Sequence, residues 1–350
     1  MAAGVRLTAM LRIATDVRLA ALLVCAAGFH VAGFNLARAA EPAPRLPLAA
    51  VADVPLPADT SRFDYESYDA RRHLLFIAHL GQSEVLVFDT RTQQVIKRIG
   101  GLRHVHGVLA IPELGRVYAS ATGTDEVVAI DEESLAEVAR MPGGTYPDGM
   151  AYAAPAGKLY VSDETGKTET VIDVGTNRRI ATIPLNGEVG NTQYDPVSGH
   201  IFVNVQSRRQ IAEIDPATDR VIARIDLPGA KGNHGLLIEP NLRLAFVACE
   251  ENDKLLVLDL VTRQVGSAFE VGSGPDVLAY DAALGLLYIA SESGTLSMFK
   301  ITGGRIQKLA DGLLAPNAHV VAVDPETHQA YFAIRNLDGH PVLRIMRPVP

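Results

Sequence analysis

The stretch "GMAYAAPAGKLYVSDETGKTETVIDVGTNRRIATIPL" (residues 149–185) contains four short apolar segments separated by turns or polar loops. "GMAYA" is followed by a turn and then by "KLYVS", which is centred on the aromatic Tyr160. A polar loop leads to "ETVID", and a second turn leads to "RIATIPL". Apolar segments of this length, bounded by turn-forming residues, are typical of strands. The stretch therefore predicts four consecutive antiparallel strands.

The same pattern returns along the whole chain. Runs of the form apolar–aromatic–apolar are centred on Phe76, Tyr118, Tyr160, Phe202, Phe246, Tyr288 and Tyr331. The successive spacings are 42, 42, 42, 44, 42 and 43 residues. The chain has only 10 Phe and 10 Tyr among 350 residues, so this coincidence is very improbable by chance. A fixed period of this length indicates a repeat protein with seven units.

The third segment of each unit leads into a recurrent turn. Segments such as "EVVAID" and "QIAEID" alternate apolar and polar residues, which predicts half-buried strands. In five units an aspartate ends this third segment and stands three residues before a hydroxyl residue. Its side chain can cap the amides of the turn that follows. The pairs are Asp89 and Thr92, Asp131 and Ser134, Asp173 and Thr176, Asp215 and Thr218, and Asp259 and Thr262. Unit six departs from this pattern, because Lys300 stands in place of the aspartate.

Seven units of four strands predict an all-β, seven-bladed β-propeller of four-stranded antiparallel blades. An open solenoid is the alternative, but it would leave exposed edges on its terminal units. Unit seven supplies three strands and ends at "VLRIMRPVP", whereas "VADVPLP" (51–57) matches the fourth strand "IARIDLP" (222–228). We therefore expect the N-terminal strand to complete the last blade and close the ring.

The N-terminal region has the features of an export signal. Three arginines precede the apolar run 19–34, and Ala37-Arg38-Ala39 has the small-X-small form of a cleavage site. We expect cleavage after Ala39 or Ala40 and a periplasmic protein; an uncleaved anchor is the alternative. The predicted organisation is a signal peptide at 1–39, a linker at 40–49 and one propeller at 50–350. The predicted blades are approximately 61–102, 103–144, 145–188, 189–230, 231–274, 275–318, and 319–350 with 50–57.

Composition excludes several classes of function. Two cysteines without a Cys-X-X-Cys motif argue against a disulfide framework, a thiolate zinc site and covalent haem c. The absence of tryptophan disfavours a quinone-cofactor dehydrogenase. The segment 1–39 carries four arginines and one aspartate, so its removal changes the formal net charge from −8 to −11. A chain with this negative charge is poorly suited to binding nucleic acid. We expect a monomer with no membrane span after cleavage.

The segments "LYVS", "FVN" and "LYIA", with the strand and turn V-X-V-X-D-X-X-T that follows, resemble the YVTN-repeat β-propellers, including YncE-like exported proteins. The resemblance covers roughly residues 50–350. It implies the propeller fold but no particular chemistry, since that family is defined by its blades. Unit six, and unit seven with its long hairpin "RNLDGH", depart from the pattern.

The repeat register also identifies a candidate site. The residue twelve positions before each aromatic should lie at the start of the innermost strand, so the seven residues should surround one mouth of the central channel. They are Asp64, His106, Asp148, Gly190, His234, Asp276 and His319. Gly190 breaks this ring and would leave an open side. The glycine that follows three of them avoids crowding between neighbouring blades.

Loops such as "DETGKTE" and "CEENDK" open on the same face and make it acidic, with His79 near the ring. Imidazoles among carboxylates suit a divalent metal ion, with His106, His234 and His319 as candidate ligands. They also suit a cationic or polyhydroxy ligand, or a general acid–base pair. In a purely structural alternative, each Asp caps strand amides and each His packs on a neighbouring blade.

Two functions follow from this site. The first is an exported scaffold, without catalysis, that binds a partner protein, a small ligand or a cation at the acidic His/Asp-lined mouth. The second is a metal-dependent hydrolase or lyase that uses the same ring, because the architecture resembles lactonase and lyase propellers. No motif in the sequence matches those enzymes residue by residue, so no catalytic residue is assigned.

Overall fold

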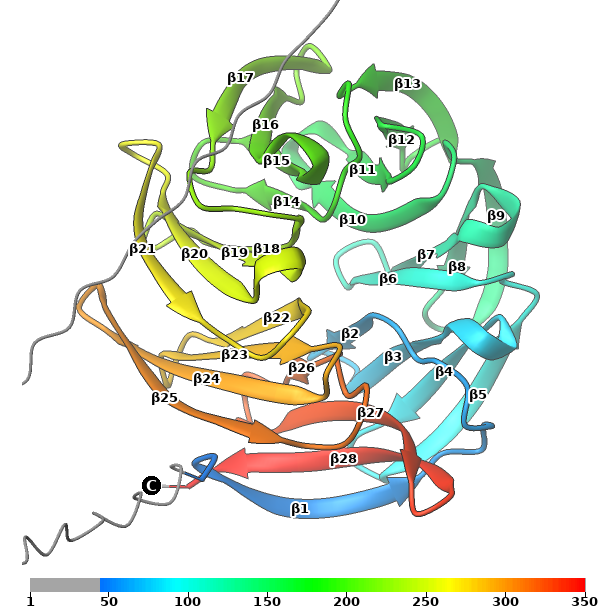
Figure 1. The fold of residues 1–350 in the computed structure, drawn as a ribbon. Coiled ribbons are helices and arrows are strands. Elements are labelled where there is room, and N and C mark those ends of the chain that lie inside the picture. Colours follow the sequence, from blue (N-terminus) through cyan, green and yellow to red (C-terminus); the bar gives the residue numbers. More distant parts are fainter. Residues whose placement is uncertain (1–44, 350) are drawn as a thin grey trace, which may run out of the picture. The chain divides into compact units, whose positions relative to one another are not determined.

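The computed structural model describes residues 45–349, and the predicted signal peptide lies outside them. The described residues form seven four-stranded antiparallel sheets, as predicted. Figure 1 shows these sheets around a common centre, with one strand of each facing inward and one at the periphery. No helix among the described residues has the length and apolar character that a membrane span requires.

The strands of the first four blades follow one another in sequence. The first blade contains β2 (Glu66–Asp69), β3 (Leu74–His79), β4 (Glu84–Asp89) and β5 (Gln94–Gly100). The second contains β6 (Val105–Ile111), β7 (Arg116–Ala121), β8 (Glu126–Asp131) and β9 (Ala136–Pro142). The third contains β10 (Pro147–Ala153), β11 (Lys158–Asp163), β12 (Thr168–Asp173) and β13 (Arg178–Pro184). The fourth contains β14 (Thr192–Asp195), β15 (His200–Val205), β16 (Gln210–Asp215) and β17 (Arg220–Asp226).

The remaining three blades keep this order until the ring closes. The fifth blade contains β18 (Asn233–Glu239), β19 (Leu244–Cys249), β20 (Lys254–Asp259) and β21 (Gln264–Glu270). The sixth contains β22 (Pro275–Asp281), β23 (Leu286–Ser291), β24 (Thr295–Thr302) and β25 (Arg305–Leu313). The seventh contains β26 (Ala322–Val323), β27 (Ala330–Leu337), β28 (His340–Pro348) and, from the N-terminal side, β1 (Leu48–Pro55). Single 3₁₀ turns are η1 (Leu80–Gln82), η2 (Thr122–Thr124), η3 (Ala154–Ala156), η4 (Gln206–Arg208) and η5 (Glu250–Asn252).

The repeated aromatic residues form part of the core. All seven are at most 3% exposed, because the second strand of each blade packs between two neighbouring sheets. The third strands differ from the half-buried strands that alternation predicts: five of the six residues in β4 are buried. Both faces of these strands are covered by neighbouring blades. The half-buried pattern occurs instead in peripheral strands, such as β13.

The capped turns are present as predicted. The Asp173 carboxylate accepts a 2.7 Å hydrogen bond from the Thr176 amide, and Asp259 accepts one of 2.7 Å from Thr262. The sixth blade has no aspartate-capped turn. Its strands β24 and β25 instead extend into a hairpin through Gly303 and Gly304, both with positive φ. The extended hairpin replaces the capped turn, so the blade forms without its aspartate.

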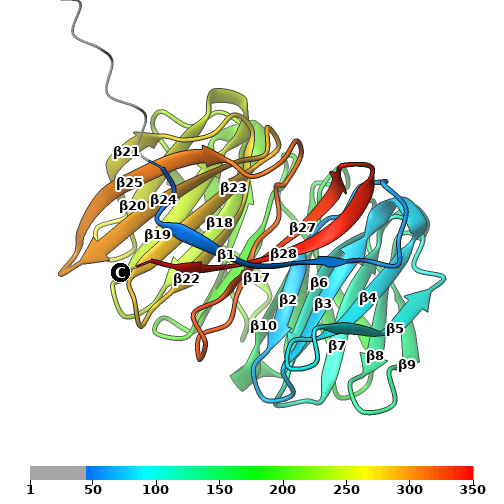
Figure 2. The ribbon, with the colours of Figure 1, turned by 90° about the horizontal axis from the view of Figure 1, so that it is seen from below.

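The N-terminal strand closes the ring. β1 pairs antiparallel with β28 from Leu48 opposite Pro348 to Pro55 opposite Val342, and Figure 2 shows the two strands side by side. The Arg344 guanidinium donates two hydrogen bonds of 2.8 Å to the Asp53 carboxylate across this pair. The strand ends at Pro55, two residues before the predicted boundary, although the Leu56 amide still donates a 3.0 Å hydrogen bond to the Pro341 carbonyl oxygen.

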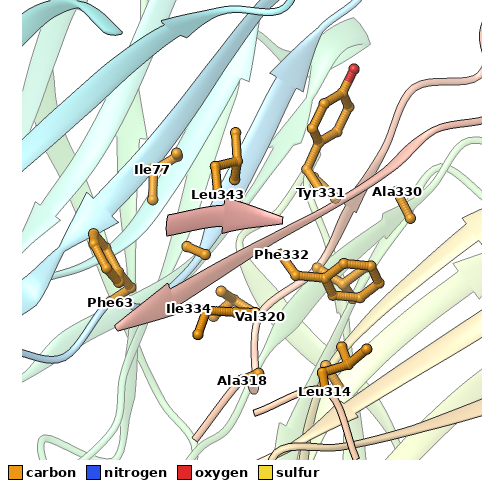
Figure 3. Close-up of a cluster of buried hydrophobic side chains, with 14 of the residues drawn as sticks. Phe63, Ile77, Leu314, Ala318, Val320, Ala330, Tyr331, Phe332, Ile334 and Leu343 are labelled. Carbon is orange, nitrogen blue, oxygen red and sulfur yellow. The ribbon is translucent and has the colours of Figure 1, made fainter. Parts of the chain in front are cut away.

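Hydrophobic packing continues across the closure. One cluster joins Phe63 and Ile77 of the first blade region to Tyr288 of the sixth blade and to Phe332 and Leu343 of the seventh. Figure 3 shows these side chains, apart from Tyr288, around the strands of the last blade. Since the cluster spans both ends of the described chain, closure rests on side-chain burial as well as on strand pairing.

Candidate functional site

The predicted ring residues meet at one mouth of the propeller. A pocket of about 600 Å³ is lined by Asp64, His106, Asp148, His234 and Asp276, together with acidic residues from neighbouring loops. His319 is adjacent, with its Nε2 3.9 Å from Asp276 Oδ2. Five blades therefore contribute to one pocket, four of them supply its carboxyl groups, and Tyr65 also lines it.

Close approach of the blades explains the small residues at this mouth. A Cβ atom on Gly107 would lie 2.2 Å from the carbonyl oxygen of Asp148, and one on Gly235 would lie 2.1 Å from that of Asp276. At Gly190 the same atom would lie 2.6 Å from the carbonyl oxygen of His234. The space beside Gly190 is thus occupied by the backbone of the next blade, and the predicted open side is wrong.

His234 is the basic centre of the pocket. Its Nε2 lies 3.6 Å from Asp148 Oδ2 and 3.9 Å from Asp276 Oδ1. Its Nδ1 lies 3.3 Å from the side-chain oxygen of Gln206, and it therefore donates to that oxygen. Burial lowers the pKa of His234, but the carboxylates of Glu250, Asp276 and Asp148 outweigh it and raise the pKa to about 9. The surrounding carboxylates therefore favour the protonated form of the imidazole.

The carboxyl groups around His234 are held in an unfavourable environment for negative charge. Burial raises the pKa of Asp148 to about 6. Burial also raises the pKa of Asp276 and of Glu250. The Glu250 carboxylate adds to the rise at Asp276, and the carboxylates of Glu292 and Glu164 add to the rise at Glu250. Desolvation and like charges both disfavour the ionised forms. A cation at this position would relieve both effects.

His319 presents a free acceptor nitrogen to the cluster. Its Nδ1 donates to the carbonyl oxygen of Asn317 at 3.1 Å, which leaves the lone pair on Nε2. That Nε2 has no hydrogen-bond partner, although the residue is only 1% exposed. It lies 3.8 Å from Glu292 Oε1. Burial lowers the pKa of His319, so the neutral ring is favoured. A neutral imidazole with a free Nε2 is the form that binds metal ions.

His106 differs from His319, although the sequence places both in the same register. Its Nδ1 donates to the carbonyl oxygen of His104 at 2.9 Å, and its Nε2 is 3.0 Å from the Tyr146 hydroxyl. Both ring nitrogens are therefore engaged. His79 does not line the pocket: it is fully buried, stacks on Phe63 at 4.4 Å and lies 3.2 Å from Glu84 Oε1.

Two groups of side chains have the spacing of metal ligands, and they are the only such groups in the described part of the chain. One consists of His234, Glu250 and Asp276, and the other of Asp276, Glu292 and His319. Within each group, one ligand atom per residue lies within 4.8 Å of the others. Imidazole nitrogen and carboxylate oxygen together form a donor set suited to a divalent transition metal. His106 belongs to neither group.

The glutamates of these groups are not among the site residues predicted from the sequence. Glu250 and Glu292 each stand four residues after the repeated aromatic of their blade, and Glu164 occupies the same position in the third blade. All three line the pocket. The sequence does contain a signal for them, because a glutamate repeats four residues after the aromatic in three blades.

Comparison with known proteins supports the fold alone. The chain matches no protein-family model, and no curated protein matches it. It is similar to a chain in the solved structure of Kuenenia stuttgartiensis hydrazine synthase, with 16% sequence identity and a TM-score of 0.69. The similarity covers 81% of this chain and 94% of the other. At this identity, the likeness is one of backbone architecture.

Proposed function

We propose that this protein is a β-propeller that binds a divalent metal ion at the channel mouth, through His234, Glu250 and Asp276. The observation that carries the proposal is a His/Asp/Glu cluster in which the histidines and Asp276 are buried and donor atoms are unpaired. Asp276 Oδ1 and His319 Nε2 are buried without hydrogen-bond partners. Buried polar atoms are normally paired, so unpaired atoms on two neighbouring residues of this mouth suggest a missing ligand.

The charge of the pocket supports a cation as that ligand. Its lining carries six carboxyl groups, opposed by Arg62 and His234. The mixed donor set favours Zn²⁺ over Ca²⁺ or Mg²⁺, because those hard cations prefer oxygen ligands alone. The carboxyl groups lining this pocket are Asp64, Asp148, Glu164, Glu250, Asp276 and Glu292.

Metal content and thermal stability test this proposal. The wild type, His234→Ala and the exposed-residue control His340→Ala would be stripped with a chelator and titrated with Zn²⁺ and Ca²⁺. We expect Zn²⁺ to raise the melting temperature of the wild type and of His340→Ala, and to leave that of His234→Ala unchanged. If Zn²⁺ leaves the melting temperature of the wild type unchanged, the ring residues cap strands and do not bind a metal ion.

A metal-dependent hydrolase or lyase is the second candidate function. Three protein ligands beside an open pocket would leave a coordination position for water or substrate. Asp148 stands close to His234, and its pKa of about 6 is suitable for a general base at neutral pH. Zn²⁺-loaded wild type would be assayed against a panel of lactones and esters, beside Asp148→Asn. Turnover that this substitution abolishes would support catalysis, and its absence would leave the binding scaffold.

The remaining parts of the proposal concern the cellular setting. The arginine-flanked apolar run and the Ala37-Arg38-Ala39 site support export and a periplasmic location. The repeat segments support kinship with the YVTN-repeat propellers. The mature charge of −11 disfavours nucleic acid. We expect a monomer whose partner is a small ligand or a periplasmic protein that docks on the acidic mouth.

A further inference from the structure

The two candidate metal groups share one carboxylate and lie on either side of it. Asp276 Oδ1 lies 3.9 Å from His234 Nε2, and Asp276 Oδ2 lies 3.9 Å from His319 Nε2. Each side adds one glutamate, Glu250 or Glu292. A carboxylate that offers one oxygen to each of two adjacent groups can bridge the paired ions of two-metal sites, which are about 3.5–4 Å apart. The donor atoms alone would therefore predict two metal ions.

Arg62 alters that prediction. Its Nη1 lies 2.7 Å from Glu292 Oε1, and its Nε donates to Asp64 Oδ2 at 3.0 Å. The other oxygen of Glu292 accepts a hydrogen bond from the Asn317 side chain. Both oxygens of Glu292 are thus engaged. The two ion pairs of Arg62 involve no residue of the group formed by His234, Glu250 and Asp276.

The Arg62 guanidinium keeps its positive charge beside Glu292 at all relevant pH values. Arginine remains charged at any pH that proteins experience, and its planar donors match carboxylate geometry. A divalent ion bound to Glu292 would have to displace Arg62 and would experience the repulsion of that charge. No arginine or lysine is ion-paired with the first group among the described residues, and the Nε2 of His234 lies 3.3 Å from the neutral Tyr65 hydroxyl. His319 keeps its unpaired Nε2 nonetheless, so the second donor set would be complete if Arg62 were removed.

We propose that the mouth holds one metal ion, in the group of His234, Glu250 and Asp276, and that the Arg62 guanidinium takes the place of a second metal ion beside Glu292 and His319. This inference rests on the proposed metal-binding function. It adds a specific role for Arg62, which is to set the number of ions bound. The negative charge of the carboxylates at the mouth is thereby balanced by the fixed charge of Arg62 and by the exchangeable charge of the metal ion.

Metal stoichiometry tests the role of Arg62. Purified wild type, Arg62→Met and Arg62→Lys would be saturated with Zn²⁺, dialysed and analysed for metal per chain. Met approximates the length of the side chain without its charge, and Lys retains the charge. We expect one ion in the wild type, one in Arg62→Lys and two in Arg62→Met. The double variant Arg62→Met with Glu292→Gln should return to one ion, since the second donor set then loses its carboxylate.

The outcomes separate this inference from the function on which it rests. One ion in both the wild type and folded Arg62→Met, or two ions in the wild type, would overturn the role of Arg62 and leave metal binding intact. No ion in the wild type would overturn metal binding itself. Circular dichroism melting of each variant identifies any loss of metal that comes from unfolding.

Discussion

His234 Nε2 lies 3.6 Å from Asp148 Oδ2, although the fourth blade separates the blades that carry them. The contact depends on Gly190, which occupies the corresponding position in that intervening blade. A side chain there would meet the backbone of His234 at 2.6–3.0 Å. Gly190, which interrupts the series of His and Asp residues in the sequence, therefore allows Asp148 and His234 to approach each other. This relationship leads directly to the first prediction.

Gly190→Ala should destabilise the protein and displace His234. The added methyl group would overpack a site bounded by backbone, which typically costs about 1–3 kcal/mol of unfolding free energy. Gly266→Ala is the matched control, since a Cβ there would meet no atom within 4 Å. Chemical denaturation of both variants measures the difference. Equal stability of Gly190→Ala and the wild type would contradict the close approach of the two blades.

Removal of β1 should open the ring. A variant that begins at Asp59 would lack the strand that pairs with β28 and would leave Arg344 without Asp53. Unpaired edge amides and an exposed part of the core should lower its melting temperature and promote association. A variant that begins at Glu41 is the control. If both melt at the same temperature, β1 does not contribute to closure.

Asp53→Ala should have a much smaller effect than removal of the strand. The Asp53 side chain is 35% exposed and that of Arg344 is 18% exposed, and ion pairs near the surface typically contribute about 0–1 kcal/mol. Denaturation at low and high salt would measure this contribution. A loss as large as that of the Asp59 variant would assign the closure to the ion pair and not to strand burial.

Glu66 should make the stability of the protein fall as pH rises. Burial raises the pKa of Glu66 to about 8, one oxygen accepts the Ala333 amide at 2.9 Å and the other has no partner. The native state keeps this proton up to about pH 8, whereas the unfolded chain releases it near 4.5. Between these values the native state binds more protons, so the unfolding free energy decreases by at most about 1.4 kcal/mol per pH unit.

Glu66→Gln should remove this contribution. The amide keeps the acceptor for Ala333 and does not ionise, so the variant should exceed the wild type in stability most clearly above about pH 8. The advantage should vanish below the ordinary carboxyl pKa. Urea denaturation at pH 5, 7 and 9 measures it, with the exposed Glu113→Gln as the control. Parallel pH profiles of wild type and Glu66→Gln would show that Glu66 ionises normally.

Export predicts a defined mature end. Mass spectrometry of the protein recovered from the periplasm should give the mass of a chain that begins at Ala40 or Glu41. Recovery of an intact Met1 terminus in the membrane fraction would favour the uncleaved anchor. If cleavage follows Ala39, the substitution Ala39→Arg should block processing, because signal peptidases require a small residue next to the cut.

The sequence by itself determined the number of blades and the place of the ring. Burial of a large aromatic in the second strand of every blade is a local requirement, so its period of about 42 residues is visible without coordinates. The pairing of the N-terminal strand with the last blade follows from counting the strands of each unit. Residues twelve positions before each aromatic reach one mouth because every blade repeats the same backbone path.

Only the tertiary structure decided what each ring residue does. His106 and His319 occupy equivalent positions, yet Tyr146 of the next blade engages His106, whereas Nε2 of His319 remains unpaired. Likewise, the pairing of Arg62 with Glu292 joins the first and sixth blades across the mouth. These contacts join different blades, and their geometry depends on how closely the blades approach. Periodicity within one chain places residues on a common face, but the donors, acceptors and charges that meet there are set by packing between blades.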